Sequence, residues 1–164
     1  MKCEIRIICN IVNGFISSIL FKVPMMNQII QNSQESQLIF PVHPRTRKIM
    51  DKLDIIHPRL HMVDPMGYLE FNYLVERAKA VITDSGGITE ETTVMNIPCM
   101  TLRDNTERPE TIELGTNELL GVNPKAIGPA MKKLFSGKWK KGKVPHLWDG
   151  KTAGRIIHHL LHLS

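Results

Sequence analysis

Segment 81–91, VITDSGGITEE, combines residue types that bind an anionic group at the end of a strand. An apolar run ends at Asp84, and Ser85, Gly86 and Gly87 follow before a segment of helical character. Glycines let the backbone approach a ligand closely, and the unpaired N–H groups at a helix start suit phosphate. The serine hydroxyl adds one more donor. The segment therefore predicts a phosphate-binding turn, although a tight strand-to-helix turn without a ligand would have the same residues.

Two adjacent glutamates, Glu90 and Glu91, follow this turn. Negative charge in the first turn of a helix stabilises the helix itself, and this is one explanation for both residues. The alternative is that one carboxylate accepts hydrogen bonds from the hydroxyls of a ribose, as acids near nucleotide-binding strands do. Spacing alone leaves both interpretations open.

A second loop, LRDNTERPET at residues 102–111, carries Arg103 and Arg108 and follows another expected strand. A guanidinium can bind two phosphate oxygens at once. The two loops together would form a clamp for a diphosphate, with backbone amides on one side and guanidinium groups on the other. The alternative is a surface salt-bridge network with the three acids of the loop, which would contribute little stability.

The elements that position these loops alternate between strands and helices. Short apolar runs typical of buried strands are QLIFPV, RLHMVD, AVITD and PCMTLR. Strands that alternate with helices of about 10–15 residues form right-handed crossovers and a parallel sheet. We therefore predict an α/β fold, a Rossmann-like doubly wound parallel sheet, in which ligands bind beyond the carboxyl ends of the strands.

Two helices can be described further. In MGYLEFNYLVERAKA, an apolar stripe predicts the buried face of a helix, and its residues are Tyr68, Leu69, Tyr73, Leu74 and Ala78. Asn123 is the expected N-cap of the helix in NPKAIGPAMKKLF.

The N-terminal apolar stretch IICNIVNGFISSILF, residues 7–21, is too short for a spanning helix, and asparagines interrupt it. It indicates a buried strand followed by a helix. Segment 12–21 could instead pack as a second strand. We expect no membrane partner.

Charge and cysteine content limit the possible classes. The net charge is +5, and segment 132–143, KKLFSGKWKKGK, holds six lysines. It is either a patch for nucleic acid or a solvated helix end and loop, and without a recognition motif we expect no nucleic-acid partner. The three cysteines, Cys3, Cys9 and Cys99, form no CxxC pair, which favours a reducing cytoplasm, and Cys99 is expected to be buried. His158 and His162 are four residues apart, but no third ligand is evident and we expect no metal.

Four segments together resemble the C-terminal half of the non-hydrolysing UDP-N-acetylglucosamine 2-epimerases: FPVHPRTRKI, TDSGGITEE, LRDNTERPETIELGTNELLG and LWDGKTAGRI. The resemblance covers about residues 37–163. This family is similar in fold to glycosyltransferases of GT-B type, in which two Rossmann-like lobes face a cleft. The resemblance implies that residues 37–164 form one UDP-sugar-binding lobe of a GT-B-type fold and that 1–36 is a divergent N-terminal segment of the same lobe.

The resemblance also implies roles for individual residues. Ser85, Gly86 and Gly87 would hold the diphosphate, Glu91 would accept from the ribose hydroxyls, and Arg108 would be a further nucleotide-site residue. Three more residues are implied near the site: Phe71, which matches an aromatic near uracil; His43, a site-lining or structural residue; and Met66, where some relatives carry a glutamine that contacts the base. Because a thioether replaces neither the donor nor the acceptor of an amide, any base contact at Met66 would come from the backbone.

The family reaction converts UDP-N-acetylglucosamine to UDP-N-acetylmannosamine. A proton leaves C2 of the sugar as UDP leaves C1, and UDP then adds back. In the family the acid and base carboxylates come from an N-terminal lobe, and a His-Arg-x-Glu-Asn motif begins the C-terminal lobe. The corresponding region here, CNIVNGFISSILFKVPMMNQ, has no histidine, arginine or glutamate.

The resemblance thus implies a lobe that binds UDP or UDP-N-acetylglucosamine, needs no cofactor and carries no catalytic residue of its own. We expect the N-terminal catalytic lobe to be absent from this chain, so that turnover requires an N-terminal lobe on another chain. The resemblance implies as a protein partner either such an N-terminal lobe or a homodimer partner. The alternatives are a non-catalytic nucleotide-sugar-binding or interaction module and a small basic nucleic-acid-binding domain.

Overall fold

The computed structural model describes residues 6–10, 19–42, 44–52 and 55–163. The strands in these ranges are β1 (Arg6–Asn10), β2 (Gln37–Pro41), β3 (Leu60–Val63), β4 (Ala80–Thr83), β5 (Cys99–Thr101) and β6 (Asn117–Leu119). The helices are α1 (Ile19–Asn32), α2 (Pro44–Lys52), α3 (Tyr68–Glu76), α4 (Ile88–Val94), α5 (Pro109–Glu113), α6 (Ile127–Phe135) and α7 (Thr152–Leu161), with a 3-10 turn at Pro124–Ala126 before α6.

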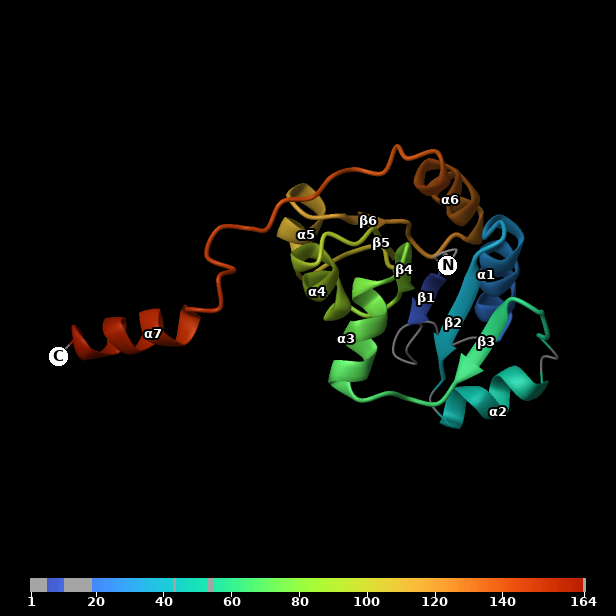
Figure 1. The fold of residues 1–164 in the computed structure, drawn as a ribbon, viewed down its shortest axis with the longest axis horizontal. Coiled ribbons are helices and arrows are strands. Elements are labelled where there is room, and N and C mark those ends of the chain that lie inside the picture. Colours follow the sequence, from blue (N-terminus) through green and yellow to red (C-terminus); the bar gives the residue numbers. More distant parts are fainter. Residues whose placement is uncertain (1–5, 11–18, 43, 53–54, 164) are drawn as a thin grey trace.

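The six strands form one sheet in the order β3-β2-β1-β4-β5-β6, and all neighbours are parallel (Figure 1). The order runs outward from β1 to β3, then returns to β4 on the other side of β1. The prediction of a doubly wound α/β fold is therefore confirmed. In such sheets the crevice at the reversal point, here between β1 and β4, is where ligands bind.

Helices cover both faces of the sheet, as the side chains of β1 show. Ile7 and Cys9 pack in the larger apolar cluster, which includes side chains of α1 and α6. Ile8, which points to the opposite face, packs with α3 and α4 in the second cluster. All three side chains are fully buried. A strand buried on both faces reads as a continuous apolar run, which is what the sequence shows for β1.

The predicted buried stripe of α3 was partly wrong. Leu69 and Tyr73 are 81% and 58% exposed, and Tyr68 is also exposed. The helix instead turns Phe71 and Val75 toward the sheet, and Leu74 packs beside them. Two apolar stripes share this short helix, so its sequence could not decide which one faces the core.

Two smaller expectations are confirmed, the cap at Asn123 and the burial of Cys99. Asn123 caps the turn before α6, because its Oδ1 accepts from the N–H of Lys125 at 3.0 Å. Cys99 is fully buried, as is Cys9. Burial raises the pKa of Cys99 to about 11 and that of Cys9 to about 12, so both thiols stay protonated. None of the described helices has the length and apolar content that a membrane crossing requires.

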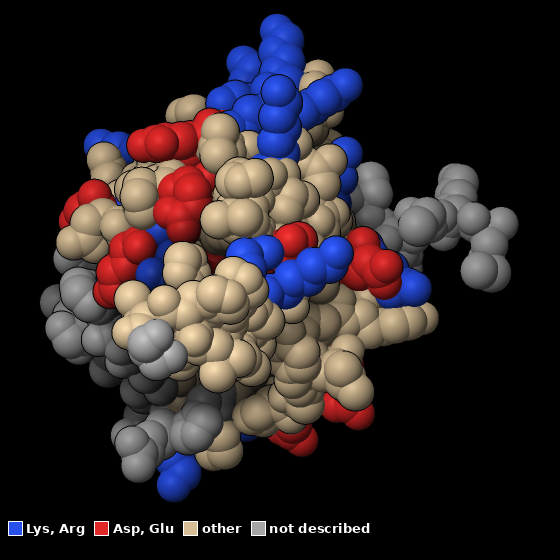
Figure 2. Space-filling view, turned by 90° about the vertical axis from the view of Figure 1, so that its left-hand side faces the viewer, with Lys and Arg blue, Asp and Glu red and all other residues tan. Residues whose placement is uncertain are grey.

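The lysine-rich segment 132–143 is not a uniform patch. Lys and Arg side chains gather at the top of Figure 2, but two of the lysines are tied to the lobe. Lys133 pairs with Glu118, and Lys140 donates to the carbonyl oxygen of Ile112. Burial is the main reason why the pKa of Lys140 lies below its usual value.

The last helix, α7, projects away from the sheet (Figure 1). Arg155 fastens its start, since Nη1 donates to both carboxylate oxygens of Asp149 at 2.9 Å and Nη2 donates to the carbonyl oxygen of Leu147 at 2.8 Å. The N–H of Lys151, and then Arg155, hold the pKa of Asp149 below its usual value. The apolar residues of α7 are exposed.

We predict that Gly115→Ala strongly destabilises the protein. A Cβ there would lie 2.4 Å from Oγ1 of Thr93 and 2.5 Å from the backbone oxygen of Thr111. Overpacking of this kind costs about 1–3 kcal/mol or more, because backbone must move. Urea denaturation should therefore show a lower midpoint.

The matched control is Gly154→Ala on α7, where a Cβ would meet nothing within 4 Å. It should unfold at or above the wild-type midpoint. An unchanged midpoint for Gly115→Ala would contradict the close packing of the loop after α5.

Candidate functional site

Two threonine side chains form hydrogen bonds with the backbone of the turn between β4 and α4. The N–H of Ser85 donates to Oγ1 of Thr83 at 2.9 Å, and the hydroxyl of Thr89 donates to the carbonyl oxygen of Gly86 at 2.6 Å. The N–H groups of Gly86 and Gly87 donate to no atom in the described ranges. Two backbone donors are therefore available at the carboxyl end of β4.

The two glycines of the turn serve different purposes. A Cβ on Gly86 would lie 3.3 Å from Nη1 of Arg103, so the missing side chain lets that guanidinium lie against the turn. A Cβ on Gly87 would meet no atom of the described residues within 4 Å, and its backbone is helical with φ −61°. As far as the described residues go, Gly87 thus leaves room for a ligand.

Arg103 brings positive charge to this turn. It follows β5, and its side chain is 12% exposed. Nη2 lies 3.9 Å from Oε1 of Glu107 on the same loop. Since neighbouring parallel strands end at the same edge, the loops after β4 and β5 meet, as the sequence predicted.

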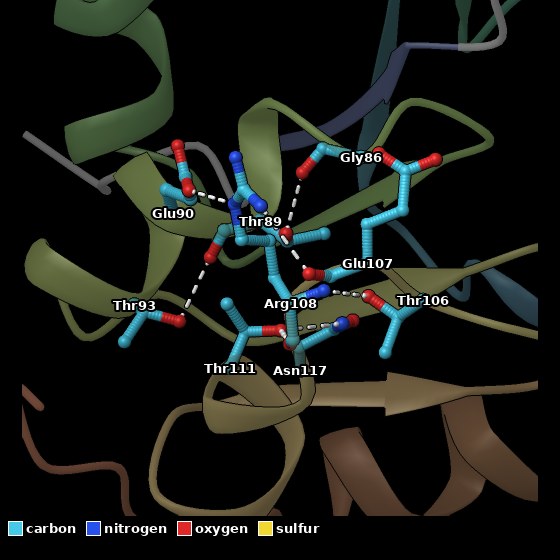
Figure 3. A network of polar contacts seen from close by, with 9 residues as sticks. All are labelled: Gly86, Thr89, Glu90, Thr93, Thr106, Glu107, Arg108, Thr111 and Asn117. Carbon is cyan, nitrogen blue, oxygen red and sulfur yellow. Dashed lines mark hydrogen bonds and ion pairs between the residues drawn. The ribbon is translucent and has the colours of Figure 1, made fainter.

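The adjacent glutamates of α4 point to different partners. Glu90 accepts from Nε of Arg108, and this contact is the main reason why the pKa of Arg108 is raised (Figure 3). Glu91 turns inward, where its Oε2 is buried and accepts no hydrogen bond from the described residues. A buried acceptor without a donor is uncommon in native structures and calls for an explanation, such as a ligand that supplies the donor.

A buried polar network holds the backbone at Arg108. The hydroxyl of Thr111 donates to the carbonyl oxygen of Arg108 at 2.7 Å, and Nδ2 of Asn117 donates to Oγ1 of Thr111 at 3.2 Å. Oδ1 of Asn117 in turn accepts from the hydroxyl of Thr101 at 2.6 Å. Figure 3 shows Thr111 and Asn117 beneath Arg108. The network links β5 and β6 to the arginine loop.

This network was not predicted from the sequence. Its members belong to short strands and helices where apolar residues were expected inside, yet Thr111, Asn117 and Thr101 are at most 1% exposed. The sequence signal that could have indicated the network is the frequency of threonine in segments 89–93 and 111–117, which places hydroxyl groups on buried faces.

Two of the three remaining predicted residues, Phe71 and Met66, belong to α3 and to the loop before it. Phe71 packs in the same apolar cluster as Ile88, the first residue of α4. Met66 lines a shallow hollow on the outer face of α3 together with Leu69 and Tyr73. His43 lies outside the described residues. Within the described ranges, no group of three or more His, Cys, Asp or Glu side chains could hold a metal ion.

Comparison with known proteins identifies a family. A family model described as UDP-N-acetylglucosamine 2-epimerase matches residues 21–161. The UDP-N-acetylglucosamine 2-epimerase of Methanocaldococcus jannaschii is 38% identical over 131 residues, which are 77% of this chain and 35% of that protein. The enzyme of Methanococcus maripaludis with the same name is 40% identical over 150 residues, 87% of this chain and 40% of its own length.

Solved structures agree in fold. The M. jannaschii UDP-GlcNAc 2-epimerase in complex with UDP-GlcNAc and UDP is 30% identical, with a TM-score of 0.82 over 98% of this chain and 46% of that chain. The Neisseria meningitidis enzyme bound to UDP-GlcNAc is 27% identical, with a TM-score of 0.84 over 99% of this chain and 46% of its own. The chain thus spans less than half the length of these relatives, and the resemblance found in its sequence is confirmed.

We predict that Asn117→Ala lowers stability by about 1–3 kcal/mol, since the hydroxyls of Thr101 and Thr111 lose a buried partner. Thermal unfolding followed by circular dichroism measures the effect. Asn105→Ala, an exposed residue of the arginine loop, is the control and should melt as the wild type does. Equal melting of the two variants would contradict the role of the network.

Proposed function

Because the chain belongs to the UDP-N-acetylglucosamine 2-epimerase family and matches its C-terminal part, we propose that it binds UDP and UDP-N-acetylglucosamine at the turn after β4. The observation that carries this proposal is the buried Oε2 of Glu91, which has no partner among the described residues and lies at the same edge of the sheet as the turn. An ionised carboxylate only accepts hydrogen bonds, so it requires a ligand with donors. Phosphate at neutral pH offers few, whereas a ribose offers two hydroxyls.

The other residues of the site bind different parts of the ligand. The N–H groups of Gly86 and Gly87 and the hydroxyl of Ser85 donate to the diphosphate, whose charge Arg103 and Arg108 balance. Their positions support this role, because the amides have no acceptor in the described ranges and Arg103 lies against Gly86. Glu91 accepts from the ribose.

The base is held nearer to α3. Phe71 packs near the uracil, and a base contact at Met66 comes from its backbone. Residues 37–164 form the lobe that carries these contacts, and segment 1–36 completes it with a strand and a helix.

Epimerisation itself needs more than this chain supplies in the proposal. As a proton leaves C2 and UDP leaves C1, negative charge grows on the diphosphate. Preorganised amides and guanidinium groups stabilise such charge best. This lobe contributes those groups to the reaction. The acid and base groups come from the part of the family fold that this chain does not match, so we expect turnover only when that part is present.

Calorimetric titration with UDP tests the proposal. We expect wild type to bind, and Gly87→Ala and Glu91→Gln each to bind about tenfold more weakly, the effect of about one charge-assisted hydrogen bond. Gly87→Ala is informative because its Cβ would meet no atom of the described residues within 4 Å, so it should weaken binding without lowering the melting temperature.

Gly154→Ala is again the control and should bind UDP as wild type does. If wild type gives neither heat nor thermal stabilisation with UDP, the proposed function is wrong. If both site variants bind with wild-type affinity, the ligand lies elsewhere on the lobe.

A further inference from the structure

We propose that Glu90 is a positioning residue, whose carboxylate orients the guanidinium of Arg108 toward the diphosphate. This inference rests on the proposed function and assigns the second glutamate of the pair a role of its own. Figure 3 shows the side chain of Arg108 reaching from the loop before α5 to Glu90 on α4. The two residues are 18 positions apart in the chain.

The contact uses one of the three guanidinium nitrogens. Nε of Arg108 donates to Oε1 of Glu90, and Nη1 lies 3.3 Å from the backbone oxygen of Glu107. Nη2 donates to no atom of the described residues. Glu90 therefore fixes the plane of the group while leaving a donor for a ligand.

The side chain of Arg108 needs a partner that orients it, because it is long and exposed to solvent. It is 48% exposed, and Glu90 is 41% exposed. The backbone of Arg108 is already held, since its carbonyl oxygen accepts from Thr111 and its N–H donates to Oγ1 of Thr106. Only the side chain remains to be ordered, and a guanidinium oriented before binding loses less freedom when it grips a phosphate.

Glu90 also connects the two halves of the site. It belongs to the first turn of α4, directly after Ser85, Gly86 and Gly87. Its position is therefore set by the same short segment that offers the backbone amides. One carboxylate thus aligns the arginine with the turn that holds the opposite side of the ligand.

A competing role would have the opposite sign. If Glu90 occupied Arg108 in place of the ligand, its removal would release the guanidinium and tighten UDP binding. The contact geometry favours positioning, because Glu90 engages Nε alone and the outer Nη2 stays available. An exposed ion pair contributes little to stability, so a purely structural role predicts no effect on either UDP or uridine.

Calorimetry with UDP and with uridine, which lacks the diphosphate, tests the proposal on wild type, Glu90→Gln, Glu90→Ala, Arg108→Ala and the double variant Glu90→Ala/Arg108→Ala. We expect Arg108→Ala to weaken UDP binding about twentyfold and Glu90→Ala about fivefold, with the double variant no weaker than Arg108→Ala alone. Glu90→Gln retains an acceptor and should lose less than Glu90→Ala. Uridine affinity and melting temperature should not change.

Glu113→Ala is the matched control, since it removes an exposed carboxylate from α5 and changes the net charge equally. It should bind UDP at least as well as wild type. Tighter or unchanged UDP binding by Glu90→Ala, or losses that add up in the double variant, would overturn the inference while the proposed function stands. Failure of wild type to bind UDP would instead contradict the proposed function.

Discussion

A buried polar side chain must find a hydrogen-bonding partner, and this requirement shapes the edge of the sheet where the site lies. Thr101 and Asn117 come from adjacent parallel strands and satisfy each other. Asn117 also reaches Thr111 on α5, which holds the backbone of Arg108. An apolar interior would have stabilised the lobe as well, but it would not have specified where this loop ends. Hydrogen bonds are directional, so the network fixes the backbone of Arg108 relative to the paired strands β5 and β6.

The charges at this edge are arranged in pairs that leave selected atoms available. Arg103 has an acid partner, Glu107, at the limit of ion-pair distance, and Arg108 has Glu90. Glu91 differs, because its Oε2 is buried and accepts no hydrogen bond within the part of the chain that the structure describes. Burying an unpaired carboxylate oxygen costs free energy, which hydrogen bonds from the hydroxyl groups of a ligand would offset. The chemistry of this one oxygen is thus what supports the proposed function.

The fold was largely predictable because strands buried on both faces appear as apolar runs, and their alternation with helices permits few topologies. The turn after β4 and the arginine loop could be placed at one edge for the same reason. The face of α3 could not, since Leu69 and Val75 lie on competing apolar stripes and tertiary packing chose between them. Glu90 and Glu91 are also equivalent by spacing. Their separation depends on where Arg108 lies in space, which no local pattern encodes.

The place of β1 in the sheet bears on how the lobe acquires its structure. Ile7 pairs in register with Leu38 on one side and with Ala80 on the other. The first pairing closes a modest loop, but the second joins residues much further apart in the sequence. Such non-local parallel pairing is slow to form. Until β4 docks, one edge of β1 exposes unpaired backbone groups along a strongly apolar strand, the kind of surface on which partly folded chains associate. The same strand that anchors the finished core is therefore a segment through which partly folded chains can associate.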